Sequence, residues 1–423
     1  MTNREQKIRR RSLLLGLSAL GVTHCVNLAK DYRTSEVEIQ QSSEYLDTIA
    51  SFESTKSLQQ LAASKGLIYG AYPQKSYANF VGGKPFKSTY IRECALLVAG
   101  FFGVSVGPVS KNTYNFREAD SFFNFAVRHK KRFRGHPLIW NEFNSPWLVN
   151  KFNASSTTSS DIEAILIDSI ETMVGRYKGQ VHSWDVVNEI INPDDGRTDD
   201  LKDTLKSGIR GEYYRSWLHF LGPNYIDLAF RVAAKADPKT MLTYNDNSIV
   251  YDFNWQERRR RAVLNTLEKL KANGTPIHAF GIQSHLNASW NQNFNERKFR
   301  DFLSDIASLG LKIIISELDV MDHELPGNIS IRDRRVARAY YQYLSVALDE
   351  PAVISVINWG LSDKFTWLSY FSPRADGKPV RPLPYNKYMR RKRAWQAIAR
   401  AFSEAPKRPK HEQFDLIPQS KIG

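Results

Sequence analysis

The chain has little cysteine and no recognisable metal-binding spacing. Only Cys25 and Cys94 occur among its 423 residues, which excludes a disulfide framework and a zinc site built on cysteine pairs. Its nine histidines are scattered, and no two of them share one helical face as metal ligands would. A glycine-rich phosphate loop is also missing, which disfavours an open nucleotide-binding sheet.

Acidic residues are the minority, with 44 Asp and Glu against 59 Lys and Arg, a formal net charge of +15. Two basic runs, 258–261 and 390–393, lie in segments with helical apolar spacing, so we interpret them as solvated helix faces. No nucleic-acid-binding module accompanies them, and nucleic acid is not an expected partner. Attraction to an acidic polysaccharide or an anionic envelope surface remains an alternative.

The first 30 residues have the pattern of an export signal. A basic patch at 7–11 precedes an apolar run that ends near Val22, too short for a stable membrane span. Arg10 and Arg11 directly before Ser-Leu-Leu fit a twin-arginine signal, which predicts a periplasmic or extracellular protein. A general secretory signal or a basic tail is the alternative. Cys25 is a candidate for lipid attachment, but His24 before it argues against this, since such sites favour small residues.

Eight strand-like stretches alternate with helical ones over about 340 residues, which is typical of the α/β class and of a (β/α)₈ TIM barrel. The predicted strands are 67–71, 95–104, 134–140, 181–188, 241–244, 279–283, 312–316 and 353–359. The predicted helices are 119–130, 161–177, 225–236, 256–273, 296–308, 331–348 and 393–402. We expect an export segment at 1–30, a linker or lead-in at 31–60, a single catalytic domain at 61–403 and a flexible tail at 404–423.

Two of these apolar stretches lead directly into a glutamate. Trp-Asp-Val-Val-Asn-Glu ends at Glu189, and Ile-Ile-Ile-Ser-Glu-Leu-Asp contains Glu317. In a barrel of this kind, catalytic groups lie at the carboxyl ends of the strands. Two carboxylates that meet there can cleave a glycosidic bond, with retention of configuration if they lie about 5–5.5 Å apart.

Polar residues at the same strand ends would support this chemistry. Asn188 precedes Glu189 and can reach a sugar 2-hydroxyl. His285 follows Gln283 at the end of the sixth strand, where it can hydrogen bond Glu317 and keep it ionised. Asp319 points to the same face as Glu317, because side chains alternate along a strand, and it can orient that histidine.

These motifs resemble those of glycoside hydrolase family 10, the family of endo-1,4-β-xylanases. Besides the two glutamate motifs, four further stretches agree with the family in the same order. They are Arg-Gly-His-Pro-Leu-Ile-Trp at 134–140, Tyr-Asn-Asp-Asn at 244–247, Gly-Ile-Gln-Ser-His-Leu at 281–286 and Asn-Trp-Gly-Leu-Ser-Asp at 358–363, followed by Trp367. The resemblance extends from about residue 60 to 402.

The resemblance implies a retaining endo-β-1,4-glycanase, with xylan as the expected substrate and no metal or organic cofactor. It implies that Glu189 is the acid/base and Glu317 the nucleophile. The sugar-binding residues would be His136, Asn188, Gln283, His285, Trp359 and Trp367, supported by Asp319, Trp140 and Asn245. The expected partner is a β-1,4-linked polysaccharide, xylan or a related polymer, and the protein is expected to be a monomer without a membrane span.

The chain departs from the family pattern at two places. The usual Glu-Asn-x-x-Lys-Trp stretch, which holds the sugar on the non-reducing side, is absent from 98–105, and Asn141 replaces the histidine after the third-strand tryptophan. At roughly 1 kcal/mol per lost hydrogen bond, substrate binding would weaken by several kcal/mol. Another β-linked envelope or capsular polysaccharide therefore remains an alternative substrate. A carbohydrate-binding protein with little turnover is a second alternative.

Overall fold

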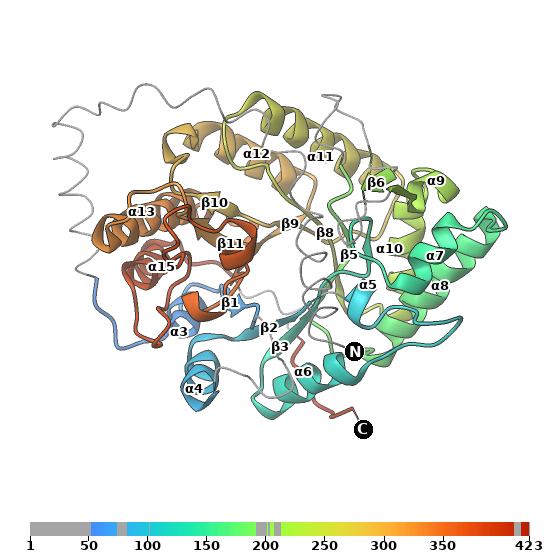
Figure 1. Ribbon diagram of the computed structural model, residues 1–423, viewed down its shortest axis with the longest axis horizontal. Helices are drawn as coiled ribbons and strands as arrows, with labels where there is room; N and C mark the ends of the chain where they lie inside the picture. Colours follow the sequence, from blue (N-terminus) through green and yellow to red (C-terminus); the bar gives the residue numbers. More distant parts are fainter. Residues whose placement is uncertain are drawn as a thin grey trace.

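The computed structural model describes residues 52–73, 83–100, 102–191, 201, 204–206, 213–409 and 416–422. At its centre is a closed ring of parallel strands, which Figure 1 shows surrounded by helices. The ring contains β1 (Ile68–Ala71), β2 (Leu96–Ala99), β3 (Arg132–Gly135), β4 (Ile139–Trp140), β5 (Ser183–Asn188), β8 (Met241–Asp246), β9 (Ala279–Ile282), β10 (His285–Asn287), β11 (Lys312–Met321) and β12 (Val353–Asn358).

The register of the strand pairs closes the ring. β12 pairs with β1, placing Ser355 beside Ile68, and β11 pairs with β9, placing Lys312 beside Ala279. Two positions in the ring are each filled by a pair of short strands. Strand β3 and then β4 pair with β5, and β9 and then β10 pair with β11. The ten strands therefore occupy eight positions, and the predicted (β/α)₈ TIM barrel is confirmed.

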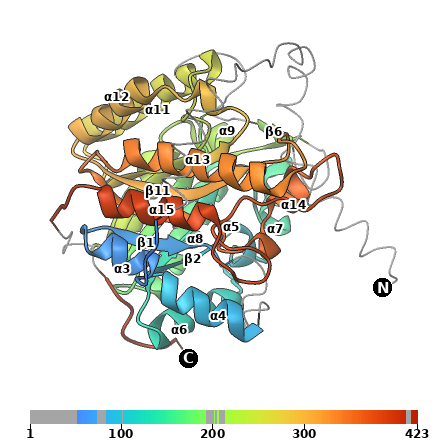
Figure 2. The ribbon, with the colours of Figure 1, turned by 90° about the vertical axis from the view of Figure 1, so that its left-hand side faces the viewer.

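The helices form the outer layer, and their apolar faces pack on the strands. They are α3 (Leu58–Ala63), α4 (Gly83–Glu93), α5 (Phe102–Ser105), α6 (Arg117–Arg128), α7 (Pro146–Asn153), α8 (Ser159–Arg176), α9 (Trp217–Leu221), α10 (Tyr225–Ala236), α11 (Asn254–Ala272), α12 (Glu296–Ser308), α13 (Ile329–Ala347), α14 (Leu368–Phe371) and α15 (Arg393–Glu404). Figure 2 shows α13 and α15 side by side across the last and first strands. A separate hairpin joins β6 (Thr204–Lys206) to β7 (Tyr213–Arg215).

Two predicted strands are shorter than expected. The stretch 95–104 is a strand only as far as Ala99, and α5 follows, with the Phe102 amide donating to the carbonyl of His136. The stretch 134–140 is interrupted between β3 and β4, where Pro137 has no amide hydrogen to give to a ladder. In both cases an apolar run continues past the strand into a turn, so the pattern alone does not mark where the strand ends.

The helix predictions agree with the structure to within a few residues. The boundaries of α10 and α12 match those predicted. The start of α8 lies before Asp161, since Thr158 is the N-cap and Asp161 completes a capping box with it. Helix α11 ends before Gly274, whose φ of +64° is a left-handed conformation that favours glycine.

The end of the chain contacts the barrel through Arg408 and through residues 419–422. The Arg408 guanidinium donates to the carbonyls of Leu348, Glu350 and Val353. The Ile422 amide donates to the Asn124 side chain. The predicted tail at 404–423 therefore includes segments that are held on the barrel, and α3 begins at Leu58, within the predicted lead-in. The export segment at 1–30 lies outside the described residues.

The basic run on α11 is divided between the protein interior and solvent. Arg259 and Arg260 are buried, so the expectation of a solvated face is wrong for these two residues. Arg259 donates to Asp246 across 2.7 Å, and Arg260 donates to the carbonyls of Ile249 and Tyr251. Arg261 is exposed and pairs with Glu257. Some of the positive charges of the chain are thus buried and paired inside the protein.

This division predicts unequal effects of two neighbouring substitutions. Arg259→Ala leaves Asp246 charged and buried without its cation, which should lower the free energy of unfolding by about 3–5 kcal/mol. Arg261→Ala, the matched control, should change it by less than about 0.5 kcal/mol. Urea unfolding followed by circular dichroism measures both. Similar losses in the two variants would contradict the assignment.

Candidate active site

The two predicted catalytic glutamates lie at the same end of the barrel. Glu189 follows β5 directly, and Glu317 lies in the middle of the long strand β11, just past the part that pairs with β9. Their exposed fractions are 6% and 4%, so both carboxyl groups are almost fully enclosed. Glu189 has a φ of +53°, a left-handed conformation that is strained for a residue with a side chain. Such strain persists only where the surroundings hold the residue in place.

Glu189 receives hydrogen bonds from two predicted site residues. The Trp140 indole donates to its Oε2 over 3.1 Å, and Gln283 Nε2 donates to its Oε1 over 2.7 Å. Its backbone amide donates to the carbonyl of Asn245 on the next strand. Three separate strand ends therefore fix the position of this carboxyl group.

Glu317 is surrounded by imidazoles and an amide. Asn245 Nδ2 donates to its Oε1 over 2.8 Å, and His285 Nε2 lies 3.3 Å from its Oε2. His136 Nε2 lies 3.9 Å from Oε1. This places His136 and His285, both predicted as sugar-binding, against the predicted nucleophile.

The surroundings of Glu317 favour its ionised form. Burial by itself raises the pKa of Glu317, but the charge of His136 and the hydrogen bond from His285 outweigh burial and bring the pKa below its usual range. Burial lowers the pKa of His285, yet Asp319 and Glu317 together raise it to about 10. At neutral pH the pair is therefore an imidazolium next to a carboxylate.

Asp319 contacts this pair from behind. Its Oδ1 lies 2.9 Å from His285 Nδ1, and its Oδ2 accepts from the Trp367 indole over 2.7 Å. Because one carboxylate binds both partners, the imidazole and the indole keep a common orientation. Trp367 also stacks on Phe371 at 4.6 Å between ring centroids.

Asn188 links the hydrogen-bond networks of the two glutamates, and its Nδ2 makes no hydrogen bond within the described residues. Its Oδ1 accepts from Asn245 Nδ2 over 2.8 Å and from Gln283 Nε2 over 3.3 Å, and these two amides also hold Glu317 and Glu189. Both bonds go to the oxygen, so the Nδ2 of Asn188 must point elsewhere. This nitrogen is buried, and within the described part of the chain it has no hydrogen-bond partner. A buried donor of this kind fits a hydroxyl of a bound ligand.

One face of Trp359 is covered by a residue that the sequence did not suggest. Tyr72 stacks on Trp359 with centroids 4.3 Å apart, and its ring occupies the space where a side chain on Gly100 would begin. Gly100 lies in the segment that lacks the polar residues of the family. The wall predicted at Trp359 is therefore an aromatic pair, and sequence reasoning missed it because Tyr72 belongs to no motif.

Asp185 and Arg134 form a second set of contacts that was missed. His136 Nδ1 lies 2.8 Å from Asp185 Oδ2, and the Arg134 guanidinium binds the other oxygen of the same carboxylate. Both charged residues are buried, and each directly follows a large aromatic residue in its strand, which was the available signal in the sequence. Asn141, at the position after the third-strand tryptophan, is buried.

The arrangement suits acid/base and nucleophilic chemistry at an acetal. Glu189 accepts hydrogen bonds from a tryptophan indole and a glutamine amide, whereas Glu317 lies against two imidazoles. The two carboxyl groups can therefore differ in protonation at one pH. Within the described ranges, no cluster of three or more His, Cys, Asp or Glu side chains could hold a metal ion. Among the same residues, no helix is both long and apolar enough to cross a bilayer. A (β/α)₈ barrel with this pair of glutamates at its strand ends is a glycoside hydrolase.

The comparisons with known proteins agree with this class. The model of glycosyl hydrolase family 10 matches residues 57–401, and the chain belongs to this family. It is 31% identical to endo-1,4-β-xylanase B of Thermotoga neapolitana over 62% of the chain and 68% of that protein, and 29% identical to endo-1,4-β-xylanase A of Humicola insolens over 64% of each. The chain spans only 28% of endo-1,4-β-xylanase C of Paenibacillus barcinonensis.

Solved structures resemble the barrel over most of its length. Xylanase 10B of Thermotoga maritima has a TM-score of 0.69 and 28% identity, covering 82% of this chain and 98% of that one. Xylanase 10B of Thermotoga petrophila, solved in complex with xylobiose, has the same TM-score and identity and covers 83% and 98%.

The contacts of Glu317 predict a pH effect for His285→Gln. Removing the imidazolium removes a contribution that lowers the pKa of Glu317, so this pKa should rise and the carboxylate should be protonated at higher pH. The acidic limb of kcat/KM, which reports groups of the free enzyme, should move to higher pH. The exposed His219→Gln variant is the control and should keep the wild-type profile. An unmoved acidic limb in His285→Gln would count against this role.

Proposed function

We propose that the protein is a retaining endo-1,4-β-xylanase that cleaves the backbone of xylan by double displacement. The single observation that supports this best is the chain of hydrogen bonds from Glu189 through Gln283, Asn188 and Asn245 to Glu317. It holds two buried carboxyl groups with different neighbours and an unpaired buried amide in one hydrogen-bonded unit. The solved relative that contains xylobiose supports a β-1,4-linked xylose polymer as the ligand.

In the proposed reaction, Glu189 and Glu317 have complementary roles. Glu189 donates its proton to the leaving glycosidic oxygen while the Glu317 carboxylate attacks the anomeric carbon. Asn188 Nδ2 donates to the 2-hydroxyl of the sugar that is attacked. Water, deprotonated by Glu189, then releases the sugar from Glu317. His285 and Asp319 keep Glu317 ionised before the attack.

A different β-linked polysaccharide is the second candidate, and Tyr72 is the observation that favours it. Tyr72 stacks on Trp359, and its ring fills the space beside Gly100, in the segment where the polar residues of the family motif are absent. An apolar aromatic surface accepts a range of sugar faces more readily than a set of directed hydrogen bonds does. Rates on xylan, mixed-linkage glucan and cellulose would rank the candidates.

The two roles predict different responses to substitution. Glu317→Ala should abolish hydrolysis of every substrate, because no nucleophile remains. Glu189→Ala should reduce hydrolysis of xylan by about 10²–10⁴-fold but affect aryl glycosides with good leaving groups much less, since these need little protonation. Rates on xylan and on a nitrophenyl xylobioside measure the contrast. Equal losses of both substrates in Glu189→Ala would argue against its acid role, and an α-configured first product would argue against retention.

We also propose that the protein is exported through a twin-arginine-type signal, to the periplasm or beyond. The support is the Arg10-Arg11 pair before an apolar run. Replacing both arginines by lysine keeps the charge but removes the pair that this export route recognises. The full-length variant should remain in the cytoplasm, as fractionation and immunoblotting would show. Export at the wild-type level would point to another signal.

A further inference from the structure

The residue that follows β1 lies at the mouth of the barrel. The Tyr72 amide donates to the carbonyl of Asn358 over 2.9 Å, which continues the pairing of β1 with β12. Because side chains alternate along a strand, Tyr72 points to the same side as Ile68, four residues earlier. Tyr72 packs in one apolar cluster with Leu96 of β2 and Met241 of β8, on the far side of the ring, so this cluster fills the barrel interior. Tyr72 therefore covers the interior at the end that carries the two glutamates.

The ring of Tyr72 has two close neighbours, Trp359 and Gly100. It stacks on Trp359 with 4.3 Å between the ring centroids and 20° between the ring planes. A Cβ atom on Gly100 would lie only 2.9 Å from Cε2 of the ring, closer than two non-bonded carbon atoms approach. The described glycines with a left-handed φ do not include Gly100, so its backbone conformation would accept a side chain. The Tyr72 ring is therefore what restricts this position to glycine.

This stack is connected to the predicted nucleophile through one imidazole. Trp359 and His136 meet edge to face at 72°, with 5.3 Å between their ring centroids. His136 Nε2 in turn lies 3.9 Å from Glu317 Oε1. Tyr72 and Trp359 are both buried, which fixes the two rings in the wall beside the sugar that Glu317 attacks. Tyr72 is thus placed to decide which sugars bind, although it does not touch the reacting atoms.

The segment after β2 adds no charged or amide group to this wall. The sequence from 98 to 107 contains neither a charged side chain nor an asparagine or glutamine. Phe102 and Val106 are fully buried, and the Phe102 ring meets Trp184 edge to face at 4.8 Å. The large side chains of this segment therefore pack into the core. A sugar beside Gly100 finds no carboxylate, ammonium or amide side chain of the segment as a hydrogen-bond partner.

We infer that Tyr72 is a specificity-determining residue that weakens sugar binding on the non-reducing side of the cleaved bond. In the family to which the chain belongs, the segment after the second strand holds the sugar on that side. Here the Tyr72 ring takes the space beside Gly100 that a sugar-binding side chain would need. Substrate binding then depends mainly on the attacked sugar and on the leaving-group side. This inference rests on the proposed function and adds to it the register in which a chain of sugars is cleaved.

The cleavage pattern of xylotetraose labelled at its reducing end tests this inference. Cleavage with one sugar on the non-reducing side leaves labelled xylotriose, and cleavage with two leaves labelled xylobiose. The variant Tyr72→Ala/Gly100→Glu removes the ring and places a carboxylate in the space that it leaves. The ratio of labelled xylobiose to labelled xylotriose should rise about five- to tenfold, because a carboxylate that accepts from a sugar hydroxyl favours the register with two sugars. A rise of less than threefold, or a fall, overturns the inference.

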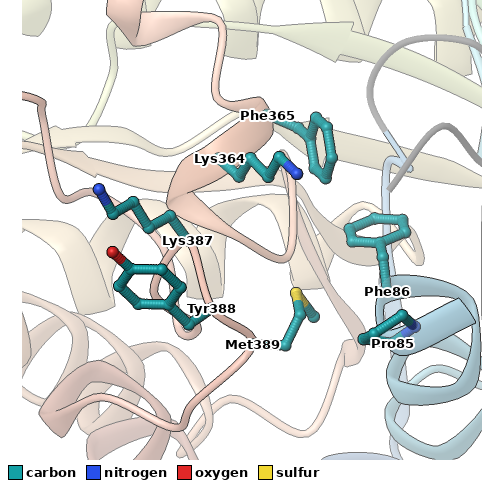
Figure 3. A pocket seen from close by; sticks show the side chains of 7 residues that line it. All are labelled: Pro85, Phe86, Lys364, Phe365, Lys387, Tyr388 and Met389. Atoms are coloured by element: carbon teal, nitrogen blue, oxygen red, sulfur yellow. The ribbon is translucent and has the colours of Figure 1, made fainter. Parts of the chain in front are cut away.

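The ratio of products does not depend on how much of the enzyme is folded, so a loss of stability alone leaves it unchanged. Tyr72→Ala/Gly100→Ser, with a smaller polar side chain, replaces the glutamate variant if that one does not fold, and the same threefold limit applies. Tyr388→Ala is the control and should keep the wild-type ratio, because Tyr388 is 69% exposed and lines a surface pocket with Lys387 and Met389 that does not include Tyr72 (Figure 3). A rise in the control equal to that in the double variant would also overturn the inference.

Binding measurements separate this inference from the proposed hydrolysis. If the wild type cleaves xylotetraose at no bond, the proposed function fails. Isothermal titration of full-length Glu317→Ala with xylotetraose then decides on Tyr72, since it requires no turnover. Adding Tyr72→Ala and Gly100→Glu to this variant should lower the Kd about five- to tenfold, for the same reason as above. An unchanged Kd overturns the inference.

Discussion

Two buried carboxyl groups, held by amides and imidazoles from neighbouring strands, are the constraint on which the site depends. Burying a charge without partners costs more than packing returns, so Glu189 and Glu317 require the donors around them. Asn245 is the centre of this arrangement. It donates to Glu317 and Asn188 and accepts from the Ser316 hydroxyl. A closed parallel barrel supplies such donors, because eight strand ends converge on one small area.

The same geometry makes the two glutamates chemically unequal. Glu317 lies against His285 and His136, which lower its pKa, while Glu189 receives the neutral donors of Trp140 and Gln283. Both residues are glutamates with similar burial, so the difference between their carboxyl groups arises from the side chains that surround each of them. A nucleophile and a proton donor can thus coexist at a single pH.

Positive charge has two distinct uses in this protein. Arg134, Arg259 and Arg260 are buried and neutralise or hydrogen bond internal groups, so they contribute to folding rather than to ligand attraction. Lys364 and Lys387, in contrast, are exposed at the protein surface. The net charge of +15 therefore overstates the positive charge that is present at the protein surface.

The sequence by itself determined the barrel fold and which residues we expect at the site. Alternating apolar runs predict strands and helices, and Glu189, Glu317 and His285 stand where those runs end. Only the tertiary structure decided the partners: the Tyr72–Trp359 stack, the Asp185–His136 contact and the burial of Arg259 join residues that are far apart in the chain or absent from any motif. Local patterns report periodicity and capping, whereas these contacts depend on how the ring closes and which strand ends become neighbours.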